Sequence, residues 1–113
     1  MSYRVRVEMQ IKAFVMSLGM EHRRAIKRGV KQLELELGDI KALGDDLEGF
    51  YRLRVGPFRI IFRYREGKVI ECVYMNRRAL VYEVFEREVI GQLKEAAGTK
   101  KTATGGRRPL GGS

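Results

Sequence analysis

The chain has 113 residues and a formal net charge of +9. This length suits one small domain rather than two, and no apolar run reaches the roughly 18 residues that a membrane span needs. The one cysteine, Cys72, excludes an intramolecular disulfide and fits a reducing cytosol. Because His22 is the only histidine, a four-ligand zinc site is also excluded. The amino-terminal residues lack an apolar signal core, so we expect a cytoplasmic protein.

The positive charge is concentrated in one segment of the chain. Residues 50–78 carry eight basic residues against two acidic ones, and residues 98–113 carry four basic residues and no acid. Such a concentration is typical of a protein that binds a polyanion such as nucleic acid. A solvated basic surface without a partner is the alternative explanation of the same pattern.

The first half of the chain predicts a strand followed by two helices. Apolar and charged residues alternate from Tyr3 to Glu8, which predicts a strand with one buried face. A helix should follow and end near Gly19, because apolar residues then recur at helical spacing at Ile11, Phe14, Val15 and Leu18. A second helix is expected from Glu21 to Leu37, antiparallel to the first. Residues 39–49 are expected to form a polar connection.

The second half predicts an antiparallel meander and a final helix. Three stretches alternate with a period of two, at residues 50–55, 58–65 and 68–75. The pairs Gly56-Pro57 and Glu66-Gly67 between them are typical of two-residue hairpin turns. An amphipathic segment from Leu80 to Ala97 predicts a helix, although its first residues also suit a strand.

The expected fold is therefore α+β, with the order β-α-α-β-β-β-α and the antiparallel meander packed on the helical hairpin. We expect residues 1–97 to form this domain. Residues 98–113 form a basic, glycine-rich tail that we expect to be disordered.

Two-residue turns would give the meander one apolar and one basic face. The apolar face would hold Leu53, Val55, Phe58, Ile60, Phe62, Tyr64, Val69, Val73 and Met75, with Glu71 as its one charged member. The basic face would hold Arg52, Arg54, Arg59, Ile61, Arg63, Arg65, Lys68, Ile70, Cys72 and Tyr74.

This register places Arg54 opposite Arg59, and Arg59 opposite Tyr74, on the solvent-facing side. Like charges in opposite positions destabilise a sheet, so the arrangement suggests that an anion binds there. The planar donors of arginine match phosphate geometry. The alternative is that basic strand faces only prevent aggregation at sheet edges.

Several polar residues outside the predicted strands are further candidates for the functional site. Arg77 and Arg78 follow the meander in a predicted loop, where site residues are common. Tyr82 could reach back over the basic face, or it could be a half-buried core aromatic. Asp45-Asp46 has no third ligand nearby in the sequence, so we expect neither a metal nor a cofactor.

The stretch from Leu47 to Tyr82 resembles the RelE/ParE superfamily of toxins. The resemblance is carried by the run GFYRLRVGPFRIIFRYREGKVIECVYMNRRALVY. This run contains an arginine-rich hairpin motif, an acidic-glycine turn, a valine-rich strand and an Arg-Arg…Val-Tyr ending. The resemblance extends over about residues 3–95 and leaves the tail outside.

The resemblance implies one of two activities. The RelE-like branch cleaves messenger RNA in the ribosomal A site, and the ParE-like branch poisons DNA gyrase. The resemblance implies five catalytic positions, and all are basic or tyrosine here, which favours the RelE-like branch: Arg52, Arg54, Arg59, either Arg77 or Arg78, and Tyr82. We further expect RNA to contact Arg63, Arg65, Lys68 and Tyr74. Some RelE-like toxins have lysines at Arg52 and Arg54, and arginine is a poor general base.

The expected function is that of a toxin from a type II toxin–antitoxin system. It would be a ribosome-dependent endoribonuclease in which the 2′-hydroxyl of the RNA attacks the adjacent phosphate. A gyrase-directed toxin and an inactive domain that binds only nucleic acid or antitoxin are the alternatives. The expected partners are messenger RNA, the ribosome and an acidic antitoxin that is partly disordered alone.

Overall fold

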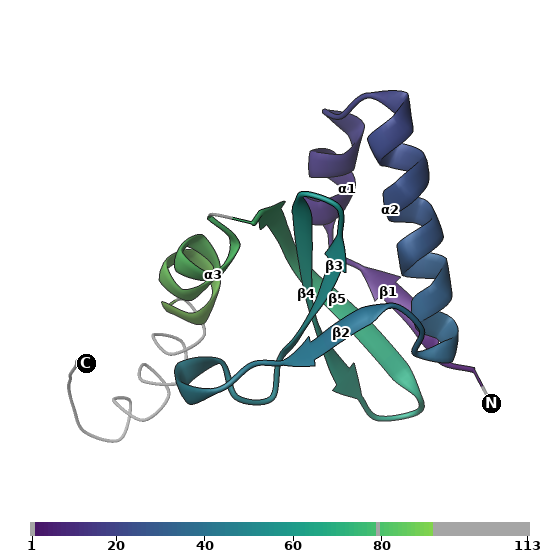
Figure 1. The fold of residues 1–113 in the computed structure, drawn as a ribbon. Helices are drawn as coiled ribbons and strands as arrows, with labels where there is room; N and C mark the ends of the chain where they lie inside the picture. The colour runs from purple at the N-terminus through teal and green to yellow at the C-terminus, as the bar shows by residue number, and fades with distance from the viewer. Residues whose placement is uncertain (1, 79, 92–113) are drawn as a thin grey trace, which may run out of the picture. The chain divides into compact units, whose positions relative to one another are not determined.

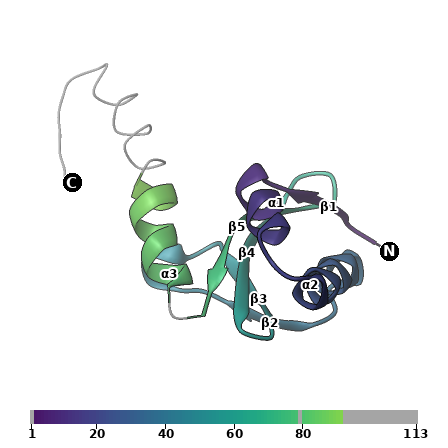
Figure 2. The same cartoon turned by 90° about the horizontal axis from the view of Figure 1, so that it is seen from above.

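The computed structural model describes residues 2–78 and 80–91. The chain divides into two compact units, Met1–Val81 and Tyr82–Ser113. The first unit is built on a five-stranded sheet with the strand order β1-β5-β4-β3-β2, and α1 and α2 lie on one face of it (Figures 1 and 2). The bounds are β1 Arg4–Val7, α1 Met9–Met16, α2 Met20–Gln32, β2 Asp39–Ala42, β3 Tyr51–Val55, β4 Phe58–Arg65, β5 Val69–Arg77 and α3 Val81–Val84. The predicted α+β class is confirmed.

Helix α1 forms where the apolar spacing predicts it. Ile11 is buried, and Phe14, Val15 and Leu18 pack against the same core. Gly19 does not end this helix, because α1 ends at Met16 and Gly19 is the residue that precedes α2. The apolar stripe was therefore the correct signal, and the assumed helix end was about two residues late.

Helix α2 is shorter than its apolar pattern predicts. It ends at Gln32, and a 3₁₀ helix follows over Leu33–Leu35. Glu36 then adopts a left-handed conformation with φ 56°, and the side chain of Leu37 is 52% exposed. The predicted helix end at Leu37 is wrong, because the chain has already left the helix and turned at Glu36.

The sheet contains a strand that the sequence pattern missed. β2 lies inside the segment 39–49, which was expected to be a polar connection, and it pairs antiparallel with β3. Only Ile40 on this strand faces the core, where it lies opposite Leu53. Four residues with only one large apolar side chain, Ile40, give too little alternation to identify a strand.

Strand β1, from the start of the chain, pairs with β5 and forms the other edge of the sheet. β1 runs parallel to β5, with Val5 opposite Ile70 and Val7 opposite Cys72. Beyond the end of β1, the side chain of Gln10 on α1 forms hydrogen bonds with the backbone at the edge of β5. Its amide nitrogen donates to the Met75 carbonyl at 2.9 Å, and its amide oxygen accepts from the Met75 N–H at 3.0 Å.

The two hairpins differ in how well the sequence predicted them. Gly56-Pro57 forms the expected two-residue turn, and Arg54 lies opposite Arg59 as predicted. The second turn contains three residues, because Arg65 pairs with Val69 and both Gly67 and Lys68 have positive φ.

The longer turn inverts the predicted faces of the first part of β5, and a bulge restores them from Tyr74 onward. The pairing shifts by one residue between Ile61 and Phe62, as expected for a β-bulge. The prediction that Ile70 and Cys72 lie on the basic face is wrong, since both lie in the core. The assignment of Val69 to the core face is also wrong, and Glu71 is no misfit, because both lie on the other face, opposite Arg65 and Arg63.

Cys72 is expected to be chemically inert in the folded protein. Burial, assisted by the negative charge of Glu71, raises the pKa of its thiol to about 12. Since the thiolate is the reactive form, iodoacetamide at pH 8 should label the native protein about a hundredfold more slowly than the urea-unfolded protein. Mass spectrometry of timed samples measures both rates. Equal rates would show that the thiol is accessible.

The end of the described chain is helical, as expected for the segment that begins at Leu80. α3 passes directly into a π-helical turn over Phe85–Ile90. The predicted extension to Ala97 and the predicted tail at 98–113 lie outside the described residues. None of the described helices is long and apolar enough to cross a membrane.

Candidate nucleic-acid interface

The face of the sheet opposite α1 and α2, here called the outer face, carries most of the predicted site. Side chains of paired residues form four rows across it, numbered from the Gly56-Pro57 turn toward the Glu66–Lys68 turn. Row 1 is Asp39, Arg54, Arg59 and Asn76, and row 2 is Lys41, Arg52, Ile61 and Tyr74. Row 3 is Arg63, Glu71 and Arg6, and row 4 is Arg65, Val69 and Arg4.

Asp39 holds the two arginines of β3. The Nη1 atom of Arg52 lies 3.0 Å from the Asp39 carboxylate and also donates to the Asp39 carbonyl at 2.9 Å. Arg54 approaches the same carboxylate only to 3.9 Å. The side chain of Arg52 is 15% exposed and that of Arg54 is 55% exposed. Arg54 is therefore the arginine of this pair that is available to an external anion.

The prediction that the Arg59 side chain faces solvent is wrong. It is 7% exposed, and its Nη1 atom donates to the carbonyls of Gly56 and Phe58, each at 2.9 Å. The alternation of β4 was read correctly, but alternation alone does not show that the guanidinium folds back onto the turn. Arg59 therefore supports the Gly56-Pro57 turn next to Arg54.

Replacing Arg59 with alanine is expected to lower the free energy of unfolding by about 2 kcal/mol, because hydrogen bonds from a charged donor are the stronger kind. Urea denaturation measures this change. Arg54→Ala is the matched variant and should change stability by less than about 0.5 kcal/mol, since its ion pair is long and exposed. Equal stability of the Arg59 variant and the wild type would contradict the supporting role.

Arg77 and Arg78, which were predicted to lie together in a loop, have different surroundings. Arg77 is the last residue of β5 and lies opposite Phe58, with its guanidinium 5.1 Å from the centre of the Phe58 ring. Since Phe58 belongs to the core under the helices, Arg77 lies on the helix side and not on the outer face. Arg78 is exposed, and its N–H donates to the Pro57 carbonyl at 2.9 Å, which places it beside the first turn.

Tyr74 and Tyr82, the two aromatic site candidates, lie in different parts of the chain's structure. Tyr74 lies on the outer face as predicted, but it is buried, and its hydroxyl accepts from the Asn76 amide at 3.3 Å. The prediction that Tyr74 lies opposite Arg59 is wrong, because Tyr74 pairs with Ile61. Asn76, which the sequence pattern did not indicate, lies opposite Arg59. Tyr82 is half-buried and belongs to the second unit, so it is not one of the residues that the sheet itself brings together.

Row 3 is an ion-pair network. The Glu71 carboxylate accepts from Arg6 at 2.7 Å and from Arg63 at 2.9 Å. Burial alone would raise the pKa of Glu71, but the hydrogen bonds and charges of these two arginines lower it below its ordinary value. The Arg63 guanidinium also lies 5.7 Å from the Phe50 ring centre. Arg63, predicted to bind RNA, is therefore already engaged by an internal carboxylate.

The end of the outer face near the second turn is exposed and basic. Arg65 and Arg4 are both exposed, whereas Lys68 leaves the face because its ammonium lies over the Tyr3 ring, 4.8 Å from the centre. The sequence reasoning did not select Arg4 and Arg6. Only the parallel pairing of β1 with β5 brings them to this face.

The outer face is suited to binding anions. It presents exposed arginines at both of its ends, while Ile61, Tyr74 and Glu71 are buried along its middle. In the part of the chain that the structure describes, no group of three His, Cys, Asp or Glu side chains could hold a metal ion.

Solved structures with the same fold are toxins or toxin–antitoxin complexes. A chain of the RelBE2 toxin–antitoxin complex from Mycobacterium tuberculosis superposes with a TM-score of 0.62 at 21% identity, covering 69% of this chain and 100% of that chain. A chain of the archaeal RelE–RelB complex from Pyrococcus horikoshii gives 0.58 at 29% identity, covering 69% and 97%. A mutant of the Escherichia coli toxin RelE in the free state gives 0.53 at 16% identity, covering 80% and 97%. No family model matches the sequence, and no curated protein matches it.

Proposed function

We propose that this chain, which has the RelE-like toxin fold, is the toxin of a toxin–antitoxin pair and cleaves messenger RNA on the ribosome. The observation that carries the proposal is the arginine cluster of rows 1 and 2. Arg52 and Arg54 flank one carboxylate on the outer face, with Arg54 exposed and Arg78 at the adjacent turn. A phosphate is the natural replacement for that carboxylate, because it offers oxygen acceptors to both guanidinium groups.

The reaction requires little from the protein beyond positioning and charge. The 2′-hydroxyl oxygen attacks the adjacent phosphorus, the bond to the 5′-oxygen breaks, and a cyclic phosphate and a free 5′-hydroxyl remain. Negative charge accumulates on the phosphoryl oxygens in the transition state. Arg54, with Arg52 behind it, would stabilise this charge. The ribosome would hold the messenger RNA in line for attack.

The reaction also removes a proton from the 2′-hydroxyl and delivers one to the departing 5′-oxygen. Arginine stays protonated and cannot serve as the general base. Tyr82 could stack on a base of the RNA or transfer a proton. We therefore propose a slow intrinsic reaction whose rate depends on the ribosome for substrate alignment.

The partner in this proposal is an acidic antitoxin. Two of the similar structures are toxin–antitoxin complexes. An acidic segment that pairs with Arg52 and Arg54 would replace the phosphate and silence the toxin. Such charge pairing should make association fast and sensitive to salt.

The experiment adds the purified full chain to translating ribosomes and maps the ends of the messenger RNA. Cleavage inside the ribosomal A site, absent when ribosomes are omitted, supports the proposal. Intact messenger RNA together with inhibited DNA supercoiling by gyrase would overturn it and favour the gyrase-directed alternative.

A further inference from the structure

Row 3 shows how this sheet binds an oxyanion. Strand β5 lies between β1 and β4, and Glu71 on β5 receives Arg6 from one side and Arg63 from the other, at 2.7 and 2.9 Å. The carboxylate is held by two arginines from strands that are far apart in the sequence, Arg6 on β1 and Arg63 on β4. The geometry of the three strands is therefore sufficient to bind a singly charged oxyanion between two guanidinium groups.

Row 4 repeats this arrangement without the acid. Val69 takes the central position on β5, with Arg4 opposite it on β1 and Arg65 opposite it on β4. Both arginines are exposed, and neither forms an ion pair with any residue that the structure describes. Row 4 therefore has the two cations of row 3 without the carboxylate that row 3 places between them.

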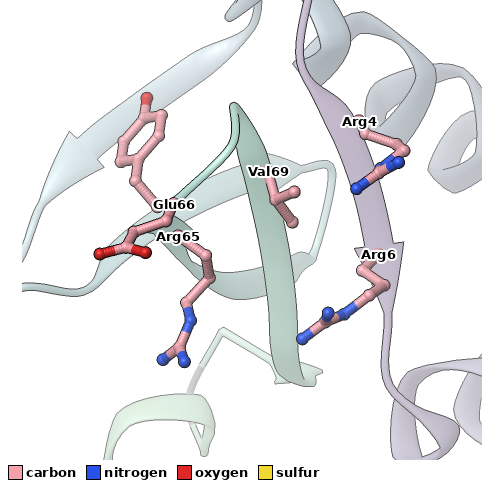
Figure 3. Close-up of a pocket in the computed structure, with 6 residues that line it drawn as sticks. Arg4, Arg6, Arg65, Glu66 and Val69 are labelled. Atoms are coloured by element: carbon pink, nitrogen blue, oxygen red, sulfur yellow. The ribbon is translucent and has the colours of Figure 1, made fainter.

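An open depression of about 520 Å³ lies at this position. It is lined by Arg4, Arg6, Tyr64, Arg65, Glu66 and Val69. Figure 3 shows the arginines of β1 on one side of Val69 and Arg65 on the other, with the Glu66 carboxylate directed away from Arg4 and Arg6. The Tyr64 hydroxyl donates to Glu36 at 2.7 Å, so it is already engaged elsewhere.

We propose that row 4 is a second phosphate site, in which Arg4 and Arg65 hold an RNA backbone phosphate above Val69. This inference rests on the proposed function and extends it to a part of the outer face outside rows 1 and 2. Row 1 and row 4 lie at opposite ends of β4, about 20 Å apart at a strand rise of about 3.3 Å per residue. The second site would hold RNA at a distance from the cleaved bond.

The chemistry of the depression favours RNA over an acidic protein segment. An amphipathic antitoxin helix or strand needs apolar contacts to stay bound, and the one aliphatic residue in the lining, Val69, is only 6% exposed. The exposed groups are guanidiniums and one carboxylate. An anion that brings charge and no apolar surface, such as a phosphodiester, matches this lining.

The test uses variants of the full chain and a fluorescent single-stranded 2′-O-methyl oligoribonucleotide, which cannot be cleaved by 2′-hydroxyl attack. Val69→Glu places in row 4 the acid that row 3 already has, and Val69→Gln is its uncharged control. The double variant Arg4→Ala/Arg65→Ala removes the two cations. Its matched control is Arg24→Ala/Arg28→Ala, which removes two exposed arginines from α2 on the other side of the sheet.

Fluorescence anisotropy should show that Val69→Glu and Arg4→Ala/Arg65→Ala each weaken oligonucleotide binding about tenfold at 0.1 M salt. For the double variant, the slope of log affinity against log salt should become less steep by about 0.7, because one phosphate contact to a single strand is lost. Val69→Gln and the α2 variant should stay within about twofold of wild type. Arg4→Ala/Arg65→Ala keeps the test valid if Val69→Glu fails to fold.

Equal losses in the double variant and the α2 variant would overturn the site, because only net charge would then matter. Normal RNA binding with weakened binding of an acidic peptide would overturn it in favour of a protein partner. The proposed function is judged separately by cleavage on ribosomes. Loss of oligonucleotide binding in the row 4 variants, combined with no cleavage by wild type, would support the phosphate site and reject the nuclease.

Discussion

Replacing Glu71 with glutamine is expected to lower the free energy of unfolding by about 2–3 kcal/mol at pH 7. The carboxylate is 10% exposed and accepts hydrogen bonds from both Arg6 and Arg63. Hydrogen bonds to a charged group contribute about 1.5–3 kcal/mol each, and the exposed Arg6 bond falls below this range. The amide of glutamine also presents donors to two groups that are themselves donors. Urea denaturation of wild type and variant measures the difference.

The loss should depend on pH in a defined direction. The pKa of Glu71 in the folded protein lies below its ordinary value of 4.5, so the ionised carboxylate stabilises the fold at every pH above that value. This stabilisation is lost as the pH falls through the folded-state pKa. The difference between wild type and Glu71→Gln should be constant from pH 7 to pH 5 and shrink below about 4.5.

Glu66→Gln is the matched control, because Glu66 lies exposed in the second turn and forms no ion pair with the described residues. It should change stability by less than about 0.5 kcal/mol. A Glu71 variant as stable as this control would show that row 3 is not an effective ion-pair network.

Replacing Arg54 with alanine is expected to slow messenger RNA cleavage on ribosomes by at least about a hundredfold. Loss of one positioned donor that stabilises charge in a transition state costs about 2.7–4 kcal/mol in comparable sites. The fold should be retained, because the Arg54 side chain is 55% exposed and its ion pair with Asp39 measures 3.9 Å. Quantitative mapping of RNA ends over time measures the rate.

Arg28→Ala is the control for this experiment, since it removes one exposed arginine from α2 and the same net charge. Its cleavage rate should match that of wild type. If Arg54→Ala cleaves as fast as Arg28→Ala, rows 1 and 2 are not the catalytic centre, whatever activity the chain has.

Local patterns along the chain were enough to predict several elements of the fold. The helical spacing from Ile11 to Leu18 and the alternation along β3 and β4 each depend on near neighbours. Those periods arise from the geometry of one helix or one strand. The first hairpin followed correctly as well, because a two-residue turn determines the register of its strands, and Arg54 therefore lies opposite Arg59.

The second hairpin could not be predicted in the same way. One additional turn residue, Lys68, changed which side of β5 faces the core from Val69 to Cys72, and the bulge between Ile61 and Phe62 restored the predicted side for Tyr74 and Met75. Side chains on a strand alternate between two faces, so a change of one residue in register moves each side chain to the other face. Glu71 and Val69 thereby came to the outer face, and Cys72 went to the core.

The sequence by itself therefore determined the α+β class, most of the element order and the basic character of the meander. Only the tertiary structure decided which arginines are free to bind an anion. Arg59 folds onto the first turn, Arg52 and Arg63 are held by Asp39 and Glu71, and Arg77 lies on Phe58. The exposed pair in row 4 depends on β1 pairing with β5. Apart from the contact of Arg59 with its own turn, these contacts join residues that are separated in the chain, so no local pattern encodes them. The Arg59 contact is local, but it depends on a side-chain conformation that strand alternation does not specify.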